Sequence, residues 1–255
     1  MIQAVFFDID GTLVPMGKET MPSSTLKALY AMREKGIKLF VATGRPPNSI
    51  LHVQKMFSFD GYLTANGQYC FHNDTIIYEK YIPHESIQQI IPYIEEHHIP
   101  VLFAMLDQSY RNIYNTDDYD SKWDIADLNT LADENIIQIM AHMTPQEDKE
   151  FLKHLPYCKS ARWTDRFADI IPEDGGKEKG IDKIIEYYHI PIENVMAFGD
   201  GGNDITMLNH VPYGVAMRNA SDEVKTHAFY VTTDAEDNGI ANALIHFGVI
   251  KKDDI

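Results

Sequence analysis

The chain is poor in cysteine, with only Cys70 and Cys158 among its 255 residues. The two lie far apart and form no CxxC pattern, so we expect no disulfide framework and assign both to buried apolar packing. No apolar run reaches the length of a membrane-spanning helix, and the residues before Asp8 lack the basic start of a secretion signal. These absences predict a soluble protein of the reducing cytoplasm.

Basic residues are also scarce. The chain has 22 Lys and Arg against 38 Asp and Glu, which gives a formal net charge of -16 at pH 7. Broad contact with nucleic acid or anionic lipid needs a positively charged surface that displaces counterions from phosphates. We therefore expect neither a nucleic-acid partner nor a membrane partner. The histidines form no HExxH or comparable spacing, so a histidine zinc site is not expected either.

The two ends of the chain predict an α/β fold. Residues 4–7 are continuously apolar, which is typical of a strand buried on both faces of a parallel sheet. An amphipathic helix is predicted over residues 23–35, and residues 37–42 repeat the buried-strand pattern. Further buried-strand runs occupy residues 195–198, 214–217 and 229–232, and a further helix is predicted over 180–188. This alternation predicts a doubly wound, Rossmann-like core with a parallel sheet.

The middle of the chain has a different pattern and predicts a small α+β domain of its own. Isoleucines at helical spacing indicate a helix near residues 87–94, which Pro92 should kink or shorten. A capping-box pattern at Thr144 predicts a second helix that ends near Leu155. Strands are predicted over residues 101–106, 111–115, 136–143 and 161–171, and Asn66-Gly67 predicts a tight two-residue hairpin turn. We therefore divide the chain into a core of residues 1–82 and 173–255 and an inserted domain of residues 83–172.

Three predicted strands of the core end in polar clusters, which are Asp8-Ile-Asp10-Gly-Thr12, Thr43-Gly44-Arg45 and Asp200-Gly-Gly-Asn203-Asp204. In an open α/β sheet, ligands bind at the carboxyl ends of the strands, so these clusters should meet at one edge. Asp8 and Asp10 are two residues apart and can point the same way, and Asp200 would add a third acid. Such acids repel one another unless their pKa values rise or a hard divalent cation binds. Mg²⁺ fits best, because it prefers oxygen ligands and often also binds a substrate phosphate.

In this order the motifs resemble those of the haloacid dehalogenase (HAD) superfamily. The similarity covers essentially the whole chain and is greatest to the Cof-like sugar-phosphatase branch, in which a large type IIB cap domain is inserted into the core. The resemblance implies that Asp8 is the nucleophile and a metal ligand. It also implies that Asp10 is the general acid/base and binds Mg²⁺ through its backbone carbonyl.

The same resemblance assigns further roles to residues at the predicted strand ends. Thr43 would hold the transferring phosphoryl group, and Asp200 would complete the protein ligands to the metal. Asn203 and Asp204 match positions that the family uses around phosphate and metal. The segment Gly175-Gly176-Lys177-Glu178-Lys179-Gly180 offers two candidates for the family's lysine. Lys177 matches relatives with a Lys-x-x-Gly pattern and is preferred, while Lys179 remains an alternative.

Next to Thr43, Gly44 and Arg45 are candidates for binding the phosphate. Arginine offers a rigid fork of donors to an anion, although a salt bridge to the inserted domain is an alternative role for Arg45. In the inserted domain, polar or aromatic residues could face a substrate, but a structural role is the simpler interpretation of each; these are Arg111, Trp123, His142 and Arg162.

The predicted function is that of a Mg²⁺-dependent phosphatase that hydrolyses small phosphate monoesters, such as sugar phosphates, through an aspartyl phosphate on Asp8. Asp10, held protonated by acidic neighbours, would protonate the leaving alcohol and then activate water. The inserted domain would act as a lid. Two alternatives stay open: a phosphomutase of the phosphomannomutase type, and a phospho-acceptor switch without rapid hydrolysis.

Overall fold

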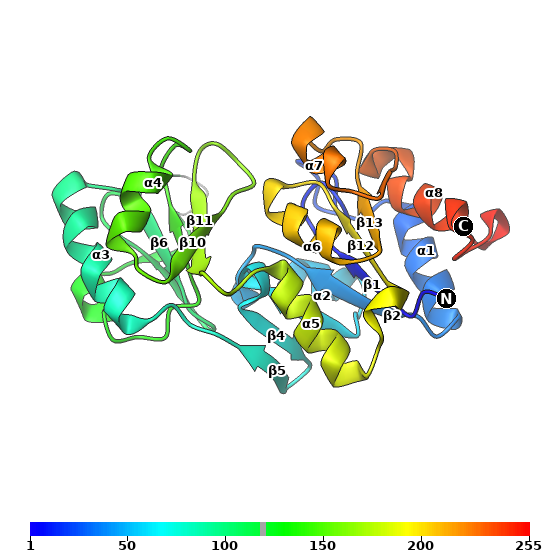
Figure 1. Ribbon diagram of the computed structural model, residues 1–255, viewed down its shortest axis with the longest axis horizontal. Helices are drawn as coiled ribbons and strands as arrows, with labels where there is room; N and C mark the ends of the chain where they lie inside the picture. The colour runs from blue at the N-terminus through cyan, green and yellow to red at the C-terminus, as the bar shows by residue number, and fades with distance from the viewer. Residues whose placement is uncertain (118–120) are drawn as a thin grey trace.

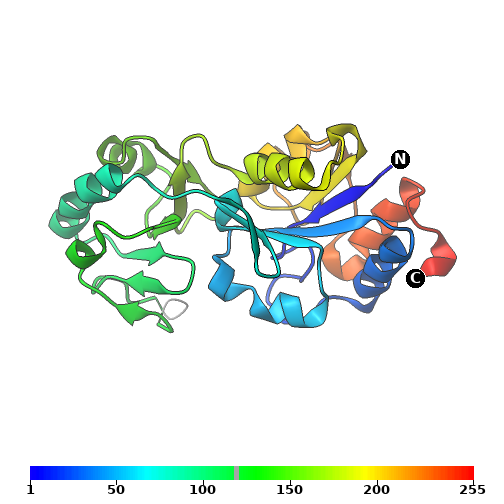
Figure 2. The same cartoon turned by 90° about the horizontal axis from the view of Figure 1, so that it is seen from below.

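The computed structural model describes residues 1–117 and 121–255. The chain forms two units that are joined by two chain segments (Figures 1 and 2). The larger unit contains both termini and all residues of the three polar clusters. The smaller unit is built from the middle of the chain. The structure therefore has an α/β core that is interrupted once, and the fold class predicted from the sequence is confirmed.

The core is built on one large sheet. Over the described residues this sheet has eight strands in the order β14-β13-β12-β1-β2-β3-β4-β5, and neighbours are parallel from β14 to β3 and antiparallel from β3 to β5. The strands are β1 (Ala4–Phe7), β2 (Lys38–Ala42), β3 (Gly61–Thr64), β4 (Tyr69–His72), β5 (Thr75–Glu79), β12 (Val195–Gly199), β13 (Tyr213–Ala216) and β14 (Tyr230–Val231). The helices are α1 (Ser23–Glu34), α2 (Leu51–Met56), α5 (Lys177–Tyr188), α6 (Ile205–His210), α7 (Asp222–Thr226) and α8 (Gly239–His246).

Both faces of this sheet are covered by helices (Figure 1). Successive side chains of a strand point to opposite faces, and in β1 they enter two separate hydrophobic clusters. Val5 and Phe7 pack in a cluster that includes residues of α1 and α8. Phe6 packs in a second cluster that includes residues of α5 and α6. A strand buried on both faces must be apolar throughout, which explains the unbroken apolar run of the sequence.

The smaller unit has a second sheet. In the described part of the chain its order is β10-β11-β9-β6-β7-β8, antiparallel except between β7 and β8. Its elements are β6 (Val101–Ala104), β7 (Ser109–Arg111), β8 (Asp124–Ile125), β9 (Gln138–Ala141), β10 (Cys158–Ala161), β11 (Ala168–Pro172), α3 (His84–His97) and α4 (Asp148–Phe151). The helices and one face of the sheet enclose a separate hydrophobic cluster. We propose on this basis that residues 83–172 form a cap domain and call them the cap below.

Short 3-10 turns connect many of these elements. They are η1 (Pro47–Ser49), η2 (Ala65–Gly67), η3 (Leu128–Leu131), η4 (Leu152–His154), η5 (Ile192–Asn194), η6 (Gly202–Asp204), η7 (Ala235–Asp237) and η8 (Lys252–Asp254). None of the helices in the described ranges is both long and apolar enough to cross a membrane. Cys70 is buried and Cys158 is partly buried, and both are free thiols, as expected.

Two helix predictions in the cap were wrong in detail. The sequence predicts a kink or an early end at Pro92, and the early end is wrong, because α3 continues to His97. Ile91 and Ile94 are buried on either side of the proline, and this tertiary packing outweighs the hydrogen bond that proline removes. The Glu147 side chain accepts a hydrogen bond from the Thr144 backbone nitrogen, which is one half of a capping box, and a second from the Thr144 hydroxyl. The α-helical part that follows is only α4, and the chain continues as a 3-10 turn.

Two strand predictions and one turn prediction were also wrong. The segment 161–171 is not one strand: it contains the last residue of β10, a loop and most of β11. The Arg162 guanidinium closes that loop by binding the carbonyls of Thr164 and Phe167. Residues 112–115 follow a strand and are not one, since the Asn112 side chain bonds to the backbone of β6. Between β3 and β4 the turn is longer than two residues, because η2 and Gln68 intervene, and Asn66 is left-handed at φ 53°.

Candidate active site

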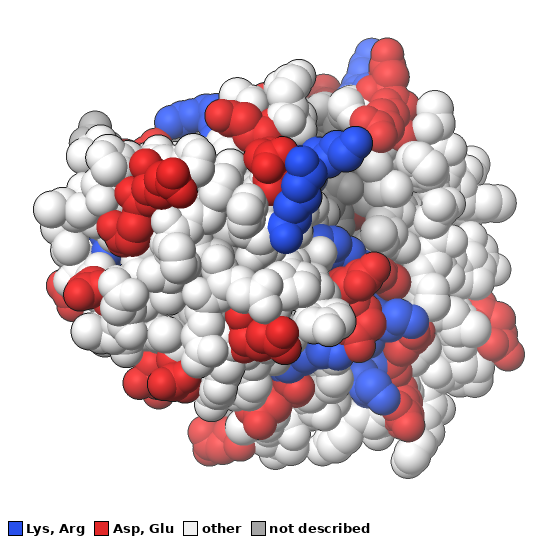
Figure 3. Space-filling model, turned by 60° about the vertical axis from the view of Figure 1, so that its left-hand side comes forward, with Lys and Arg blue, Asp and Glu red and all other residues white. Residues whose placement is uncertain are grey.

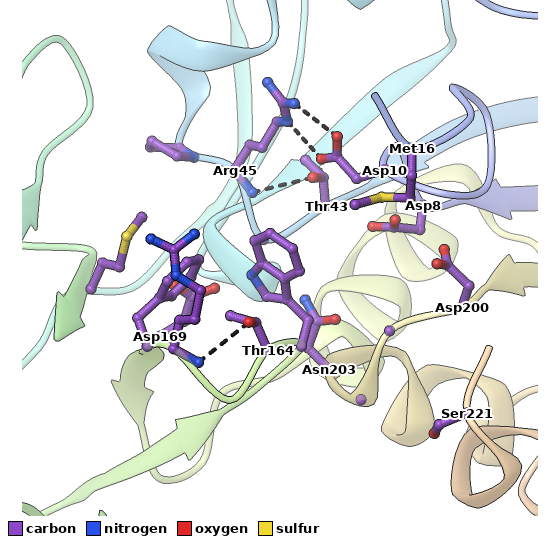
Figure 4. A pocket seen from close by; sticks show the side chains of 18 of the residues that line it. Asp8, Asp10, Met16, Thr43, Arg45, Thr164, Asp169, Asp200, Asn203 and Ser221 are labelled. Carbon is purple, nitrogen blue, oxygen red and sulfur yellow. Dashed lines mark hydrogen bonds and ion pairs between the residues drawn. The ribbon is translucent and has the colours of Figure 1, made fainter. Parts of the chain in front are cut away.

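The three polar clusters do meet at one edge of the core sheet. Asp8, Thr43 and Asp200 each directly follow a strand, and these strands, β1, β2 and β12, are neighbours. Parallel strands present their carboxyl ends at the same edge, so residues 8, 43 and 200 converge although they are far apart in the sequence. Figure 4 shows Asp8 and Asp200 facing the same space.

Three carboxylates form a tight acidic group. One carboxylate oxygen each of Asp8, Asp200 and Asp204 lies within 4.8 Å of the others. Burial raises the pKa of Asp8 well above its usual value; Lys177 opposes this shift, and the neighbouring acids add to it. Burial and then Asp204 raise the pKa of Asp200 to about 7. The cluster is therefore short of positive charge, and its donors are all oxygen, the ligand type that Mg²⁺ prefers.

A buried lysine joins two of these acids. Lys177 at the start of α5 is 1% exposed, and its Nζ lies 2.7 Å from Asp8 Oδ1 and 2.5 Å from Asp204 Oδ1. Nζ also donates to the carbonyl of Ala42 at 2.9 Å. Burial lowers the pKa of Lys177, but Asp204 and Asp8 raise it by more, so the amine stays charged. Lys179 is exposed, so the structure places Lys177, and not Lys179, at the acidic group.

The Asp204 side chain stabilises the loop after β12. Its Oδ2 accepts hydrogen bonds from the backbone nitrogens of Asp200 and Gly201, both at 2.9 Å, while Oδ1 binds Lys177. Both of its oxygens are therefore already engaged by donors. Asp204 therefore holds Lys177 and the loop in place from one buried side chain.

Asp200 is itself held by two neighbours. The Thr12 hydroxyl donates to Oδ1 at 2.7 Å, and Asn219 Nδ2 donates to Oδ2 at 2.8 Å. Gly11, at φ +84°, brings the first loop so close that any Cβ there would overlap the Asp200 carboxylate. The sequence analysis missed Asn219, which no motif marks. The available signal was its place after β13, a further parallel strand that ends at the same edge.

The Asp10 carboxyl has a direct partner that the sequence analysis did not predict. Its two oxygens accept hydrogen bonds from Arg45 Nε at 2.7 Å and Arg45 Nη2 at 2.8 Å (Figure 4). Asp10 was expected to have acidic neighbours, and Asp8 and Asp200 do interact with it, but the group that its oxygens bind directly is a guanidinium. Arg45 lies in the loop after β2, the strand next to β1, and its guanidinium can donate two parallel hydrogen bonds to a carboxylate. Arg45 is engaged with Asp10 here and does not point freely at the phosphate position.

The acidic group lies at the base of a cavity between core and cap. The cavity has a volume of about 680 Å³, within the roughly 300–1,000 Å³ of small-molecule sites. From the cap its lining includes Met140, His142, Trp163, Phe167 and Asp169. On the face of the molecule drawn in Figure 3, basic and acidic residues are intermingled around a hollow, and no continuous basic field is visible. Such a cavity suits a small ligand.

Only His142 of the four cap candidates lines the cavity. Arg162 is structural, since its guanidinium binds Asp148 and four backbone carbonyls. Arg111 is also structural, because it donates to the carbonyls of Trp123 and Asn115. The sequence analysis missed Trp163 and Asp169, which lie in and beside a loop that it had assigned to a strand.

A family model described as haloacid dehalogenase-like hydrolase matches residues 5–244. The chain belongs to the haloacid dehalogenase-like hydrolases. Pyridoxal phosphate phosphatase YbhA of Escherichia coli is 31% identical over 264 residues, covering 94% of this chain and 96% of that protein. The 5-amino-6-(5-phospho-D-ribitylamino)uracil phosphatase YitU of Bacillus subtilis is 27% identical, covering 94% of this chain and 95% of that protein.

Similarity to solved structures defines the branch. A HAD subclass IIB sugar phosphatase is 38% identical, with a TM-score of 0.91, and the match covers 97% of this chain and 100% of that one. This HAD chain is therefore an enzyme of the Cof-like phosphatase branch, as the resemblance of its motifs implied. The roles of individual residues are taken up as proposals below.

In this HAD chain the cap loop after β10 packs closely against the core loop after β12. A Cβ added at Gly202 would lie 2.5 Å from the carbonyl oxygen of Arg162, a backbone atom that cannot rotate away. We predict that Gly202→Ala displaces this cap loop and lowers kcat/KM on phosphate esters about tenfold, because small displacements in a site are costly. Steady-state kinetics would measure the loss, and a melting curve like that of the unmodified protein would show an intact fold. An unchanged kcat/KM would contradict the prediction.

Proposed function

We propose that the protein is a Mg²⁺-dependent phosphatase that hydrolyses small phosphate monoesters, such as sugar phosphates. The observation that carries the proposal is the position of Asp8, which lies beside a buried lysine and a second acid at the base of a cavity. This arrangement gives a nucleophile, positive charge and space for a leaving group in one place. The sugar phosphatase and the pyridoxal phosphate phosphatase among the relatives support a small phosphorylated metabolite as substrate.

The residues present fit a magnesium ion. We propose that Asp8 and Asp200 would hold it through their side chains and Asp10 through its backbone carbonyl. Burial and the neighbouring acids raise the pKa values of Asp8 and Asp200, so negative charge is costly here and a bound cation would offset it. When bound, Mg²⁺ would offset negative charge on the phosphoryl oxygens and on the acids around them.

In the proposed reaction, Asp8 attacks phosphorus, and the bond between phosphorus and the leaving oxygen breaks. Lys177 and the Thr43 hydroxyl stabilise the charge on the phosphoryl oxygens. Asp10 must first turn from Arg45 toward Asp8 and take up a proton from solvent, and it then gives that proton to the leaving oxygen. Water then attacks phosphorus, Asp10 takes the proton of that water, and the bond between Asp8 and phosphorus breaks to release phosphate. The cap excludes bulk water during these steps.

Phosphate release from a panel of monoesters, measured before and after chelation, tests this function. We predict that removing divalent cations lowers the rate about 100-fold or more and that added Mg²⁺ restores it, because the acidic group is then left without its counter-charge. A melting curve recorded in the chelator controls for unfolding. Undiminished release in the chelator would contradict the proposed metal dependence. Phosphoryl exchange without release, or a long-lived phosphoprotein, would favour the phosphomutase or the switch.

A further inference from the structure

One face of the cap sheet faces the core across the cavity. Along β9 and the residue after it, Gln138, Met140 and His142 alternate with Ile139 and Ala141, which pack in the hydrophobic cluster of the cap. The first three therefore point away from that cluster, and Met140 and His142 line the cavity. Asp169 of β11 is the direct antiparallel partner of Met140, so it lies on the same face. It brings a carboxyl group to the cap side of the cavity.

Asp169 is a buried carboxyl with one oxygen unused. The residue is only 1% exposed, yet it lines the cavity. Its Oδ2 accepts a hydrogen bond from Asn66 Nδ2 at 2.9 Å. Its Oδ1 is buried and has no hydrogen-bond partner among the residues that the structure describes. A buried acceptor without a partner is destabilising, so it is retained where a ligand or another group completes it.

The position of Asp169 relative to the phosphoryl site is fixed by Asn66. The Asn66 side chain also bonds to Gln138 Oε1 at 3.0 Å and, through its Oδ1, to Asn203 Nδ2 at 2.9 Å. Its backbone nitrogen donates to the carbonyl of Thr43 at 3.0 Å. Asn66 therefore connects β9 and β11 of the cap to the core loops that contain Thr43 and Asn203. Asp169 is thus held at a set place on the cap side of the cavity that Asp8 and Thr43 line from the core.

The chemistry around Asp169 favours a hydroxyl as its partner. Burial raises the pKa of Asp169 to about 7, although Asn66 and then Lys177 oppose the shift. A hydroxyl can donate to a carboxylate oxygen or accept from a protonated carboxyl, so it suits a buried carboxyl whose pKa is raised. Nearby on the cap side, Phe167 and Trp163 lie edge to face at 5.2 Å and offer an apolar surface. A ring with an apolar face and a hydroxyl matches both features.

We propose that the free oxygen of Asp169 binds a hydroxyl group of the leaving alcohol and so determines which phosphate esters are hydrolysed well. This inference rests on the proposed phosphatase function and identifies a substrate-binding residue of the cap. The hydroxyl can come from a sugar or from the ring of a heteroaromatic alcohol, and the two sources call for separate arms of the test. In either case an ester without a hydroxyl on its leaving group would gain nothing from Asp169.

The test is a double-mutant cycle in which one change is made in the protein and one in the substrate. The proteins are the unmodified chain, Asp169→Asn and Asp169→Ala. The substrates are a hexose 6-phosphate with a series lacking one hydroxyl each, pyridoxal phosphate with its 3-deoxy analogue, and p-nitrophenyl phosphate. We expect both variants to lose about tenfold or more in kcat/KM on the hydroxyl-bearing ester of one arm, which is either the hexose 6-phosphate or pyridoxal phosphate. The loss should vanish for the analogue that lacks the relevant hydroxyl and stay below about twofold for p-nitrophenyl phosphate.

Asp165→Asn is the matched control, because Asp165 is exposed in the same cap loop and should leave all rates unchanged. Melting curves of the Asp169 variants exclude a general loss of fold as the cause of a selective effect. Equal losses on every substrate, or none on any, would overturn the inference while leaving the phosphatase function in place. Inactivity of the unmodified chain on the whole panel would instead refute the proposed function and the inference with it.

Discussion

Asp8→Asn is expected to lower kcat by about four orders of magnitude, because an amide cannot act as the nucleophile that forms the phosphoenzyme. The substitution is nearly isosteric, and the amide oxygen can still accept the hydrogen bond that Lys177 Nζ donates at 2.7 Å. It also removes one member of a repelling acidic group in which the pKa of Asp8 is raised by burial. The melting temperature should therefore stay the same or rise while the activity disappears.

The measurement is single-turnover and steady-state phosphate release, together with thermal unfolding of the same preparations. Asp74→Asn is a suitable control, since Asp74 is exposed in the turn between β4 and β5, away from the cavity. A variant that keeps more than a tenth of the unmodified rate would refute the assignment of Asp8 as nucleophile. Loss of fold in Asp8→Asn would refute the account of the acidic group as a source of repulsion.

Lys177→Met is expected to reduce both activity and stability. Methionine fills a similar volume, but it leaves Asp8 and Asp204 buried without their cation. Removing one partner of a buried ion pair costs about 3–5 kcal/mol of unfolding free energy. We also expect kcat to fall about 1,000-fold, because the amine no longer stabilises charge on the phosphoryl group. Lys179→Met, at an exposed site two residues away, should change stability by less than about 0.5 kcal/mol.

The pH dependence of the unfolding free energy separates the loss of the Lys177 charge from a simple packing defect. Without Lys177, the pKa of Asp8 in the folded protein should rise further above its value in the unfolded chain. The folded state then binds more protons than the unfolded state, so the stability of the variant relative to the unmodified protein should recover as the pH falls. Urea unfolding at pH 7 and pH 5 would measure the difference. A destabilisation that is the same at both pH values would contradict the electrostatic account.

Local sequence patterns predicted the core well because they reflect short-range physics. The apolar run of β1 indicates burial on both faces, and each of the strands β1, β2 and β12 ends directly at a polar cluster. The rule that ligands bind at the carboxyl ends of parallel strands was then enough to bring Asp8, Thr43 and Asp200 together. The preference for Lys177 over Lys179 also agrees with their positions, since only Lys177 is buried against the acids.

The cap was predicted less well, because its short elements depend on contacts from elsewhere in the chain. The loop between β10 and β11 is closed by the Arg162 guanidinium, and an apolar pattern cannot reveal such a contact. The pairing of Asp10 with Arg45 joins residues 35 positions apart. Asn66 was marked only as a turn residue, although its side chain connects core and cap. Each of these features is a side-chain contact between distant segments.

The sequence by itself determined the class of fold, the edge of the sheet where chemistry occurs and the acidic residues that gather there, because strand burial and the polar residues after each strand are local properties. Only the tertiary structure decided which side chains pair with one another and which residues of the cap line the cavity. The physical reason is that hydrogen bonds, ion pairs and desolvation depend on distances of a few ångströms between segments far apart in the chain.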